Sequence, residues 1–379
     1  MPHPDAVCVT GLAWNTPLGS DLDEVWKLLL DGASGLRDIE CPYPLRTTLA
    51  GTVPGLALDA PATERQVALA VSTLRAAYAS AGLHPADPAV RLVLGTSFGA
   101  SLDEPAHRLG DWARESARRI GHPHRPVCLG TACSAGSDSI LVASRLIQAG
   151  VCDVCLAGGV DVVTLAKRLG HSALGTMSRD RLRAFDERHD GMVPGEGAAV
   201  LVLESADSAR RRGAPVHAVL GGTGSANDAA GLTAPDRSGD SVVLAVQRCL
   251  ADAGRDAAQV AVISAHATGT PVNDEVESAS LGRIFGTGGT RPVVFATKGA
   301  LGHSLGATGA IEAVSVVLAL RDGRVPPVAG LGRPRPDFPL PLAVGTACAV
   351  DGAVGLSLTI GFGGFNTCLL FERVGTDER

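Results

Sequence analysis

A cysteine with the chemistry of a nucleophile lies where an apolar run gives way to a helical pattern. Cys133 follows the run 127–132, and Ile140, Ala143 and Ile147 come next at the spacing of one helix face. Unpaired N–H groups at a helix N-terminus lower the pKa of a thiol and raise its thiolate fraction. The pattern therefore indicates an activated nucleophile, with a small buried thiol in a core turn as the alternative.

Two histidines and a lysine follow further apolar runs. His266 ends the run that starts at position 260, and the hydroxyl residues Thr268 and Thr270 come directly after it. His303 lies five residues after Lys298, in a glycine-bearing turn that leads into a helical pattern. Sites in α/β proteins usually lie at such strand ends. The alternatives are a polar turn around His266 and a helix cap beside a solvated lysine at His303.

Two other patterns suggest chemistry less strongly. Cys152 and Cys155 form a C-x-x-C, but they open a predicted strand, and no second ligand pair follows at zinc spacing. The turn around His303 lacks the residue order of a phosphate-binding loop. We therefore expect two ordinary strand thiols at 152 and 155, and no metal site.

The elements that must position these side chains alternate along the chain. Predicted strands cover 6–11, 92–96, 127–132, 153–158, 198–203, 260–265, 292–296 and 353–360. Predicted helices cover 21–31, 67–81, 134–149, 240–253, 274–285 and 306–320. This alternation indicates an α/β protein whose sheets are covered by helices on both faces. No low-complexity linker divides the chain, so its parts are expected to pack into one body.

Composition excludes several classes of function. The 379 residues carry a net charge of -6, and aromatic residues make up only 3% of them, which argues against a nucleic-acid-binding surface. No apolar run reaches the length of a membrane span, and the N-terminus lacks the pattern of a secretory signal. The nine cysteines are an odd number. We therefore expect a cytoplasmic protein with free thiols, without membrane or nucleic-acid partners.

Taken together, six segments resemble the β-ketoacyl synthase family, in its elongating form with a Cys-His-His set. They keep the family's order and span nearly the whole chain: 9–12, 131–136, 185–197, 266–270, 298–309 and 361–366. The resemblance implies a thiolase fold, in which two similar βαβαβαββ halves make a five-layered αβαβα sandwich. The expected halves are 1–212, with Cys133, and 213–379, with His266, Lys298 and His303.

The resemblance also implies a reaction. A primer acyl group moves from a carrier thioester to Cys133, and a malonyl-type thioester then loses carbon dioxide and attacks it. The backbone N–H groups of Cys133 and Phe362 form the oxyanion hole. His266 and His303 donate to the thioester oxygen of the extender, and Lys298 is expected to fix charge and orientation near His303.

Further roles carried over from the family concern substrate binding and support. Thr268 and Thr270 would bind the phosphopantetheine arm of an acyl carrier protein, and no other cofactor or metal is implied. Phe365, in the gating loop 361–366, stands where the family has a small hydroxyl residue, so an altered acyl channel is expected. Glu312 would close the polar network around Lys298, and Asp274 is a second supporting carboxylate.

Several positions depart from the family pattern. The stretches 56–65 and 97–125 are short, and the basic cluster expected to meet the carrier protein is reduced to Arg65. Ala267 and Asn273 replace glycines; the first is tolerable at negative φ, and the second suits positive φ. His189 replaces an arginine. The other candidates for carrier contact, or else ordinary solvated surface, are Arg179, Arg181, Arg183 and Arg210 to Arg212.

Alternative functions remain open at the level of sequence. The family usually dimerises, so a homodimer or a heterodimer with a related subunit is expected. An acyltransferase or malonyl decarboxylase would use Cys133 without forming a carbon–carbon bond. A non-catalytic partner subunit is the third reading, against which the intact set of Cys133, His266, Lys298 and His303 argues. A thiolase would need a second active-site cysteine, and an initiating ketosynthase would have Cys-His-Asn.

Overall fold

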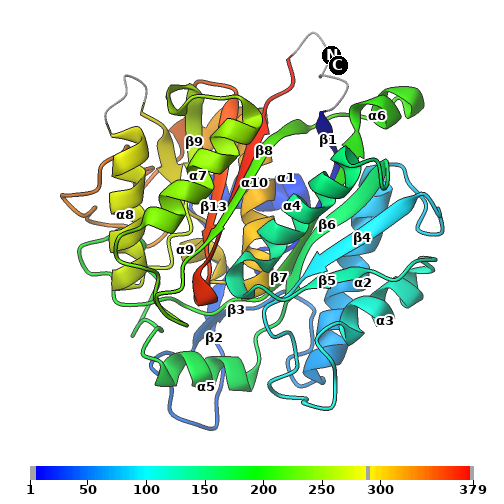
Figure 1. The fold of residues 1–379 in the computed structure, drawn as a ribbon. Coiled ribbons are helices and arrows are strands. Elements are labelled where there is room, and N and C mark those ends of the chain that lie inside the picture. The colour runs from blue at the N-terminus through cyan, green and yellow to red at the C-terminus, as the bar shows by residue number, and fades with distance from the viewer. Residues whose placement is uncertain (1–5, 287–290, 376–379) are drawn as a thin grey trace.

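The computed structural model describes residues 6–286 and 291–375, which form one ten-stranded mixed sheet with helices packed against it (Figure 1). The first half of the chain contributes β1 (Val7–Asn15), β4 (Val90–Gly95), β5 (Val127–Leu129), β6 (Val154–Asp161) and β7 (Gly197–Ser205) to this sheet. The second half contributes β8 (Ala218–Asn227), β9 (Val260–Ser264), β10 (Val293–Phe295), β13 (Val354–Ile360) and β14 (Phe365–Glu372). Two small ribbons lie outside it: β2 (Leu36–Asp38) with β3 (Leu49–Gly51), and β11 (Arg324–Val325) with β12 (Cys348–Ala349).

The strand order is the same in both halves. From the outside inward it reads β5-β4-β6-β7-β1 in the first half and β10-β9-β13-β14-β8 in the second. Each set thus places its third strand at the edge and its first strand at the centre. The two sets join where β1 pairs antiparallel with β8, from Val7 opposite Leu220 to Val9 opposite Ala218.

Helices form the other layers of the molecule. They are α1 (Leu22–Leu30), α2 (Ala62–Ser80), α3 (Asp111–Ile120), α4 (Ala135–Gln148), α5 (Leu165–Ala173), α6 (Ala206–Arg212), α7 (Asp240–Ala253), α8 (Pro271–Phe285), α9 (Lys298–Leu301) and α10 (Thr308–Asp322). Helix α2 packs on β1 and β7, and α7 packs on β8 and β14. Helices α4 and α10 lie between the two sets of strands, because α4 contacts β6 and β14 while α10 contacts β7 and β13. The layer order is therefore α–β–α–β–α.

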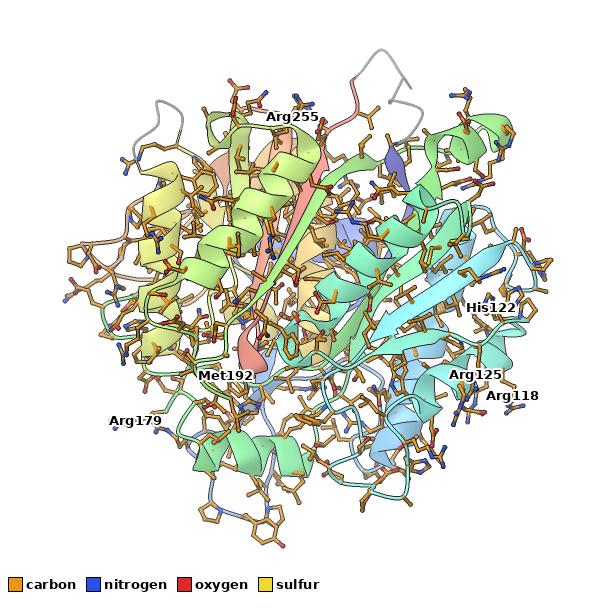
Figure 2. All side chains as sticks on the ribbon, viewed as in Figure 1. Arg118, His122, Arg125, Arg179, Met192 and Arg255 are labelled. Atoms are coloured by element: carbon orange, nitrogen blue, oxygen red, sulfur yellow. The ribbon has the colours of Figure 1, made fainter. Side chains whose placement is uncertain are left out.

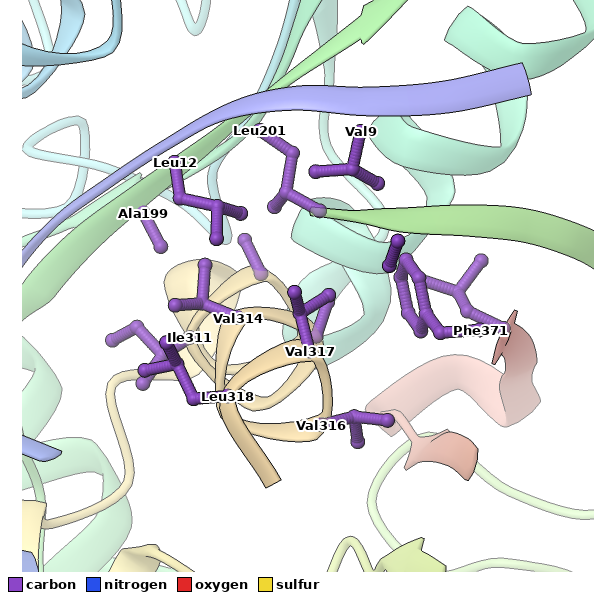
Figure 3. Close-up of a cluster of buried hydrophobic side chains, with 14 of the residues drawn as sticks. Val9, Leu12, Ala199, Leu201, Ile311, Val314, Val316, Val317, Leu318 and Phe371 are labelled. Carbon is purple, nitrogen blue, oxygen red and sulfur yellow. The ribbon is translucent and has the colours of Figure 1, made fainter. Parts of the chain in front are cut away.

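Helix α10 is buried on every side, and its sequence explains why. Residues 308–320 are almost uniformly small or apolar, which suits a helix with no solvent face. Ile311, Val314 and Val317 project into a cluster that includes Leu201 of β7 and Phe371 of β14 (Figure 3). This central helix therefore supplies core to both halves at once.

The predicted elements are all present, with shifted ends. The helix predicted from position 274 begins at Pro271, so Asn273 lies inside α8 and does not adopt the positive φ expected of it. The sequence analysis missed β8 and β14 of the large sheet, the four short strands of the two small ribbons, and the helices α3, α5, α6 and α9. Glycines weaken the strand pattern of β8 and interrupt the helical pattern of α5, where Gly170 lies mid-helix.

Within the described residues, no helix is both long and apolar enough to cross a bilayer. All nine cysteines carry free thiols, including Cys152 and Cys155 at the start of β6.

Candidate active site

Cys133 lies in a tight turn between β5 and α4, as the sequence predicts. The turn is the single 3₁₀ turn Ala132–Ser134, and α4 starts at the next residue. Ala132 adopts a φ of +50°, a backbone conformation that residues other than glycine rarely adopt. Gly306, from the turn after His303, packs so closely on the end of β4 that a Cβ would lie 2.2 Å from the Ser97 nitrogen. Backbone from both halves thus meets beside Cys133.

The prediction of a lowered pKa for Cys133 is wrong. Burial of the sulfur raises its pKa to about 11, and this outweighs the Phe362 N–H that donates to it and the nearby Lys298. The thiol is therefore protonated at neutral pH in the absence of substrate. The same contact places the Phe362 N–H beside Sγ, where the resemblance implies an oxyanion donor.

The pH dependence of alkylation follows from this pKa. Alkylation of Cys133 by iodoacetamide needs the thiolate. Its rate is expected to rise about tenfold per pH unit through pH 9 and to level only toward pH 11. Peptide mapping by mass spectrometry after timed labelling measures it, with N-acetylcysteine as the reference thiol. A plateau below pH 9 would mean that the N-terminus of α4 lowers the pKa of Cys133 by more than burial raises it.

Lys298 contacts His266, and not His303 as predicted. Its ammonium lies 3.3 Å from His266 Nδ1, donates to the His266 carbonyl oxygen, and forms an ion pair with Glu312. The correction arises from α9, a helix of one turn that directs Lys298 back toward the end of β9. The expected link between Glu312 and Lys298 is present. Burial raises the pKa of Glu312 to about 7, although Lys298 opposes this.

His303 faces His266 at the bottom of the site. The two ring centroids are 5.4 Å apart, with the planes at 84°. Cys133 Sγ and a nitrogen from each ring all lie within 4.8 Å of one another, and all three side chains are buried. The structure thus brings together the three residues that the sequence singled out, although the histidines come from the other half of the chain.

Contacts at Nδ1 set the protonation pattern of both rings. The ammonium of Lys298 donates to His266 Nδ1, and the N–H of Leu305 donates to His303 Nδ1 at 3.3 Å. Burial, followed by the charge of Lys298, holds the pKa of each imidazole well below its ordinary value. Both rings are therefore neutral at pH 7, with Nδ1 as acceptor and the proton on Nε2.

Glu277 was missed by the sequence reasoning. It accepts the backbone N–H groups of His266 and Ala267, at 2.6 and 2.8 Å, and burial raises its pKa to about 7. This support matters because Ala267 has a φ of +49°, so the expectation of a negative φ there is wrong. The available signal was the pair of acidic residues at 274 and 277, one turn apart at the start of α8.

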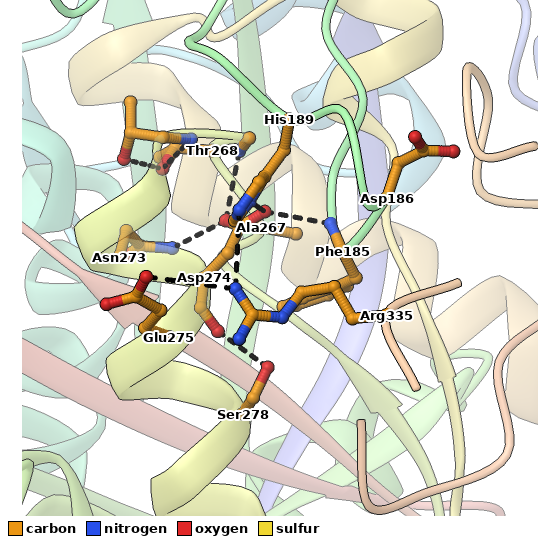
Figure 4. Close-up of polar contacts among 12 residues, drawn as sticks. Phe185, Asp186, His189, Ala267, Thr268, Asn273, Asp274, Glu275, Ser278 and Arg335 are labelled. Carbon is orange, nitrogen blue, oxygen red and sulfur yellow. Dashed lines mark hydrogen bonds and ion pairs between the residues drawn. The ribbon is translucent and has the colours of Figure 1, made fainter. Parts of the chain in front are cut away.

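Asp274 ties a second segment to this loop (Figure 4). Its carboxylate accepts the N–H of Phe185 at 2.8 Å and that of Gly269 at 3.1 Å. His189 Nδ1 lies 3.1 Å from the same group and Arg335 lies 3.3 Å from His189 Nε2. Asp274 therefore supports the loop after His266 from outside the cavity.

Two cavities meet at Cys133. The smaller, of 260 Å³, is lined by His266 and His303 and by Thr268 and Thr270, whose hydroxyls are 2.8 Å apart. The larger, of 410 Å³, is mostly apolar. Its lining includes Phe98, Leu102, Leu232, Leu305 and Phe365. Phe362 borders both cavities. The Cys133 side chain thus borders both a polar cavity and an apolar one.

The arginines expected at the carrier surface behave differently from one another. Arg65 is 5% exposed and paired with the buried Glu196, so its predicted role in carrier contact is wrong. Arg183 is held by Asp180, and Arg210 to Arg212 each pair with an acidic residue. Arg179 projects from the molecular surface (Figure 2) and makes no ion pair within 6–286 and 291–375.

Comparisons with known proteins agree with this geometry. The sequence model of the β-ketoacyl synthase N-terminal domain matches residues 5–122 and 124–209, and that of the C-terminal domain matches residues 217–331. The mitochondrial 3-oxoacyl-[acyl-carrier-protein] synthase of Arabidopsis thaliana is 31% identical over 431 residues, covering 97% of this chain and 93% of the relative. That alignment is longer than the chain, so the relative contains segments with no counterpart here.

Solved structures give the same result for the fold. The ishigamide ketosynthase/chain length factor superposes with a TM-score of 0.90 at 30% identity, covering 98% of this chain and 99% of that chain. A type II PKS acyl-carrier protein in complex with its ketosynthase, bound to the hexaketide, gives 0.89 at 26% identity, covering 98% and 100%. The expected thiolase-type sandwich is thereby confirmed.

Proposed function

Because this chain belongs to the β-ketoacyl synthase family, we propose that it joins a Cys133-bound acyl group to a malonyl-type carrier thioester by decarboxylative condensation. The observation that carries the proposal is the convergence of the Cys133 sulfur and one nitrogen each of His266 and His303 within 4.8 Å. One nucleophile and two neutral N–H donors are what the two half-reactions need.

In the first half-reaction, Cys133 attacks the primer thioester and the carrier thiol leaves with the proton. The tetrahedral oxygen accepts hydrogen bonds from the backbone N–H groups of Cys133 and Phe362, and the Phe362 N–H is already next to the sulfur. The acyl chain then occupies the apolar cavity, where burial of each CH₂ contributes about 0.8 kcal/mol.

In the second half-reaction, the malonyl-type thioester enters the polar cavity past Thr268 and Thr270. Loss of carbon dioxide leaves an enolate, whose oxygen accepts from Nε2–H of His266 and of His303. The enolate carbon attacks the acyl carbonyl, the bond from that carbon to Cys133 Sγ breaks, and the departing thiolate takes up a proton from water as the β-ketoacyl product leaves. Lys298 and Glu312 keep His266 in the donor form throughout.

We propose that no metal takes part, although two imidazoles and a thiol are also zinc ligands. The ammonium of Lys298 lies 3.3 Å from His266 Nδ1 and would repel a dication. The Phe362 N–H that donates to Cys133 occupies the sulfur with a hydrogen-bond donor. Both features fit a site built for developing negative charge.

The proposed partner is an acyl carrier protein, which delivers both substrates on its phosphopantetheine arm. A similar ketosynthase has been solved in complex with its acyl-carrier protein. Arg179 and the exposed Arg181, whose guanidinium lies 3.8 Å from the Asp180 carboxylate, follow closely after Thr176, which lines the polar cavity. They offer positive charge for an acidic carrier near this cavity.

We also propose a dimer, formed through the free edge of β5. Among the described residues this strand ends the sheet and pairs with β4 alone, and its Val127 is 44% exposed. An unpaired strand edge with an apolar side chain favours pairing with a second chain. Sedimentation of the purified chain tests which dimer forms. A dimeric species would mean a homodimer, and a monomeric species would favour a heterodimer with a related subunit.

The deciding experiment is intact-protein mass spectrometry with a panel of acyl-carrier thioesters, followed by addition of malonyl-carrier. Acylation and then a β-ketoacyl-carrier product is the expected result. Acylation without a carbon–carbon bond would favour an acyltransferase. Acetyl-carrier alone would favour a decarboxylase. No acylation by any donor would favour a non-catalytic partner subunit, a role suggested by the chain length factor in the name of a similar structure.

Phe365 offers a test of chain-length control. Its ring lines the apolar cavity and is 37% exposed. Phe365→Thr enlarges the cavity, so the ratio of heptanoyl to hexanoyl acylation rates is expected to rise about fourfold, the value of one well-buried CH₂. Phe365→Leu, which keeps an apolar side chain, serves as the control. An unchanged ratio in the threonine variant would remove Phe365 from the acyl channel.

A further inference from the structure

A third histidine borders both cavities and has no part in the reaction described above. Helix α5 presents Lys167, Gly170 and His171 to the apolar cavity, and Leu174 follows just beyond its end. Their spacing of three, four and seven residues is that of one helix face. Of these four, His171 and Leu174 also line the polar cavity that contains the catalytic histidines. His171 is therefore close to where the first carbons of a Cys133-bound acyl chain would lie.

The ring of His171 is fixed by two neighbours. Its centroid lies 5.7 Å from that of Phe362, and its Nδ1 lies 3.0 Å from Thr176 Oγ1. The Thr176 hydroxyl donates to the His171 carbonyl oxygen at 3.2 Å, so its proton is already used. Nδ1 must then be the donor to Thr176, which leaves the lone pair on Nε2. Nε2 has no hydrogen-bond partner among the residues that the structure describes.

His171 stays neutral under ordinary conditions. Burial, followed by the charge of Lys167 one turn earlier, lowers its pKa to about 4. The ring is therefore an uncharged hydrogen-bond acceptor at pH 7, and not a cation that would attract a carboxylate.

The other polar side chains that line the apolar cavity are already hydrogen-bonded or exposed to solvent, unlike Nε2 of His171. Ser97 and Lys167 also line the cavity, but both are bonded to the buried Asp161. Thr233 is exposed to solvent. His171 is half-buried, so water can reach Nε2 until an acyl chain fills the cavity. A chain that can donate a hydrogen bond at that point is then favoured, because a chain that cannot would leave the acceptor unpaired and shielded from water, which is costly.

We propose that His171 is a specificity residue that selects acyl chains with a hydroxyl group near the thioester, the hydroxyl donating to Nε2. This inference rests on the proposed function, since it assumes that an acyl chain on Cys133 fills the apolar cavity. A keto group at the same carbon accepts but does not donate, so it gains nothing from His171. A saturated chain leaves Nε2 without a partner.

The test uses pantetheine amides, in which nitrogen replaces the thioester sulfur, so that binding is measured without acyl transfer. Calorimetry gives Kd for the hexanoyl, 3-oxohexanoyl and each 3-hydroxyhexanoyl amide. One 3-hydroxy enantiomer is expected to bind about two- to tenfold more tightly than the hexanoyl amide, and the 3-oxo amide no more tightly. In His171→Phe this ratio falls to about one.

Two further variants make the result specific. Thr176→Val frees the ring to change tautomer and is expected to give an intermediate ratio. Leu174 lines the same two cavities, and Leu174→Ala enlarges them without changing their polarity. This variant is therefore expected to change every Kd but to leave the ratio between the hydroxy and saturated amides intact. Equal wild-type affinities, a ratio that survives in His171→Phe, or no binding of any amide would each overturn the proposal.

Failure of the proposed function has a different signature. Mass spectrometry of wild type with the matching thioesters reports acylation of Cys133 independently of the amide ratios. A hydroxyl preference without acylation would refute the condensing reaction and leave the role of His171 in binding intact. Acylation of Cys133 without a preference for the hydroxy amide would refute the role of His171 and leave the proposed reaction intact.

Discussion

Cys133→Ala is expected to abolish acyl-enzyme formation and to lower the condensation rate by a factor on the order of 10³ or more. The sulfur is the single nucleophile that lies within 4.8 Å of both ring nitrogens among the described residues. The variant should fold, because alanine fits wherever cysteine does and the turn is held by its backbone. Intact-protein mass spectrometry after incubation with acyl-carrier measures the first effect, and product chromatography measures the second.

Cys128→Ala supplies the matched control. Cys128 lies on β5, five residues before the nucleophile, and its pKa is also raised to about 11 by burial. It should leave both readouts unchanged, because its sulfur is not among the converging atoms. Full acylation of Cys133→Ala would contradict the assignment and would direct attention to another thiol, which peptide mapping would identify.

Lys298→Met is expected to lower the free energy of unfolding by about 3–5 kcal/mol and to abolish condensation. The substitution leaves Glu312 fully buried without its ammonium partner, and it removes a donor from the His266 carbonyl oxygen. His266 also loses the contact at Nδ1 that keeps its proton on Nε2. Chemical denaturation and product formation measure the two effects.

The double variant Lys298→Met, Glu312→Leu separates stability from chemistry. It removes both charges of the pair, so most of the lost stability is expected to return. Activity is not, because His266 still lacks its ammonium neighbour. Lys27→Met, on the exposed side of α1, controls for loss of a lysine. Recovery of activity in the double variant would show that Lys298 acts only by neutralising Glu312.

The sequence located the three converging residues because each lies after a predicted strand, and the resemblance of the surrounding segments to the family then singled them out. It was insufficient for Lys298, whose proximity to His303 along the chain suggested the wrong partner. One turn of helix, α9, reverses that relation in space. Spacing in sequence therefore located the groups but not the contacts between them.

Burial explains most of the other differences. The lowered pKa expected for Cys133 considered only the start of α4, whereas desolvation depends on what both halves pack around the sulfur. Arg65 resembled a surface cation, yet the fold encloses it with Glu196. His171 carried no local motif, and Glu277 carried only the acidic pair that it forms with Asp274. Their roles arise from cavities and loop ends that exist only after the chain is folded.

The central position of α10 has a consequence for how the protein is made. Strands β6 and β7 emerge from the ribosome long before residues 308–322, the helix that packs against them. Until then the inner face of the first five strands has α4 but not α10 to cover it, and its valines and leucines face water or a chaperone. Synthesis must therefore proceed through nearly the whole chain before either half can close its core.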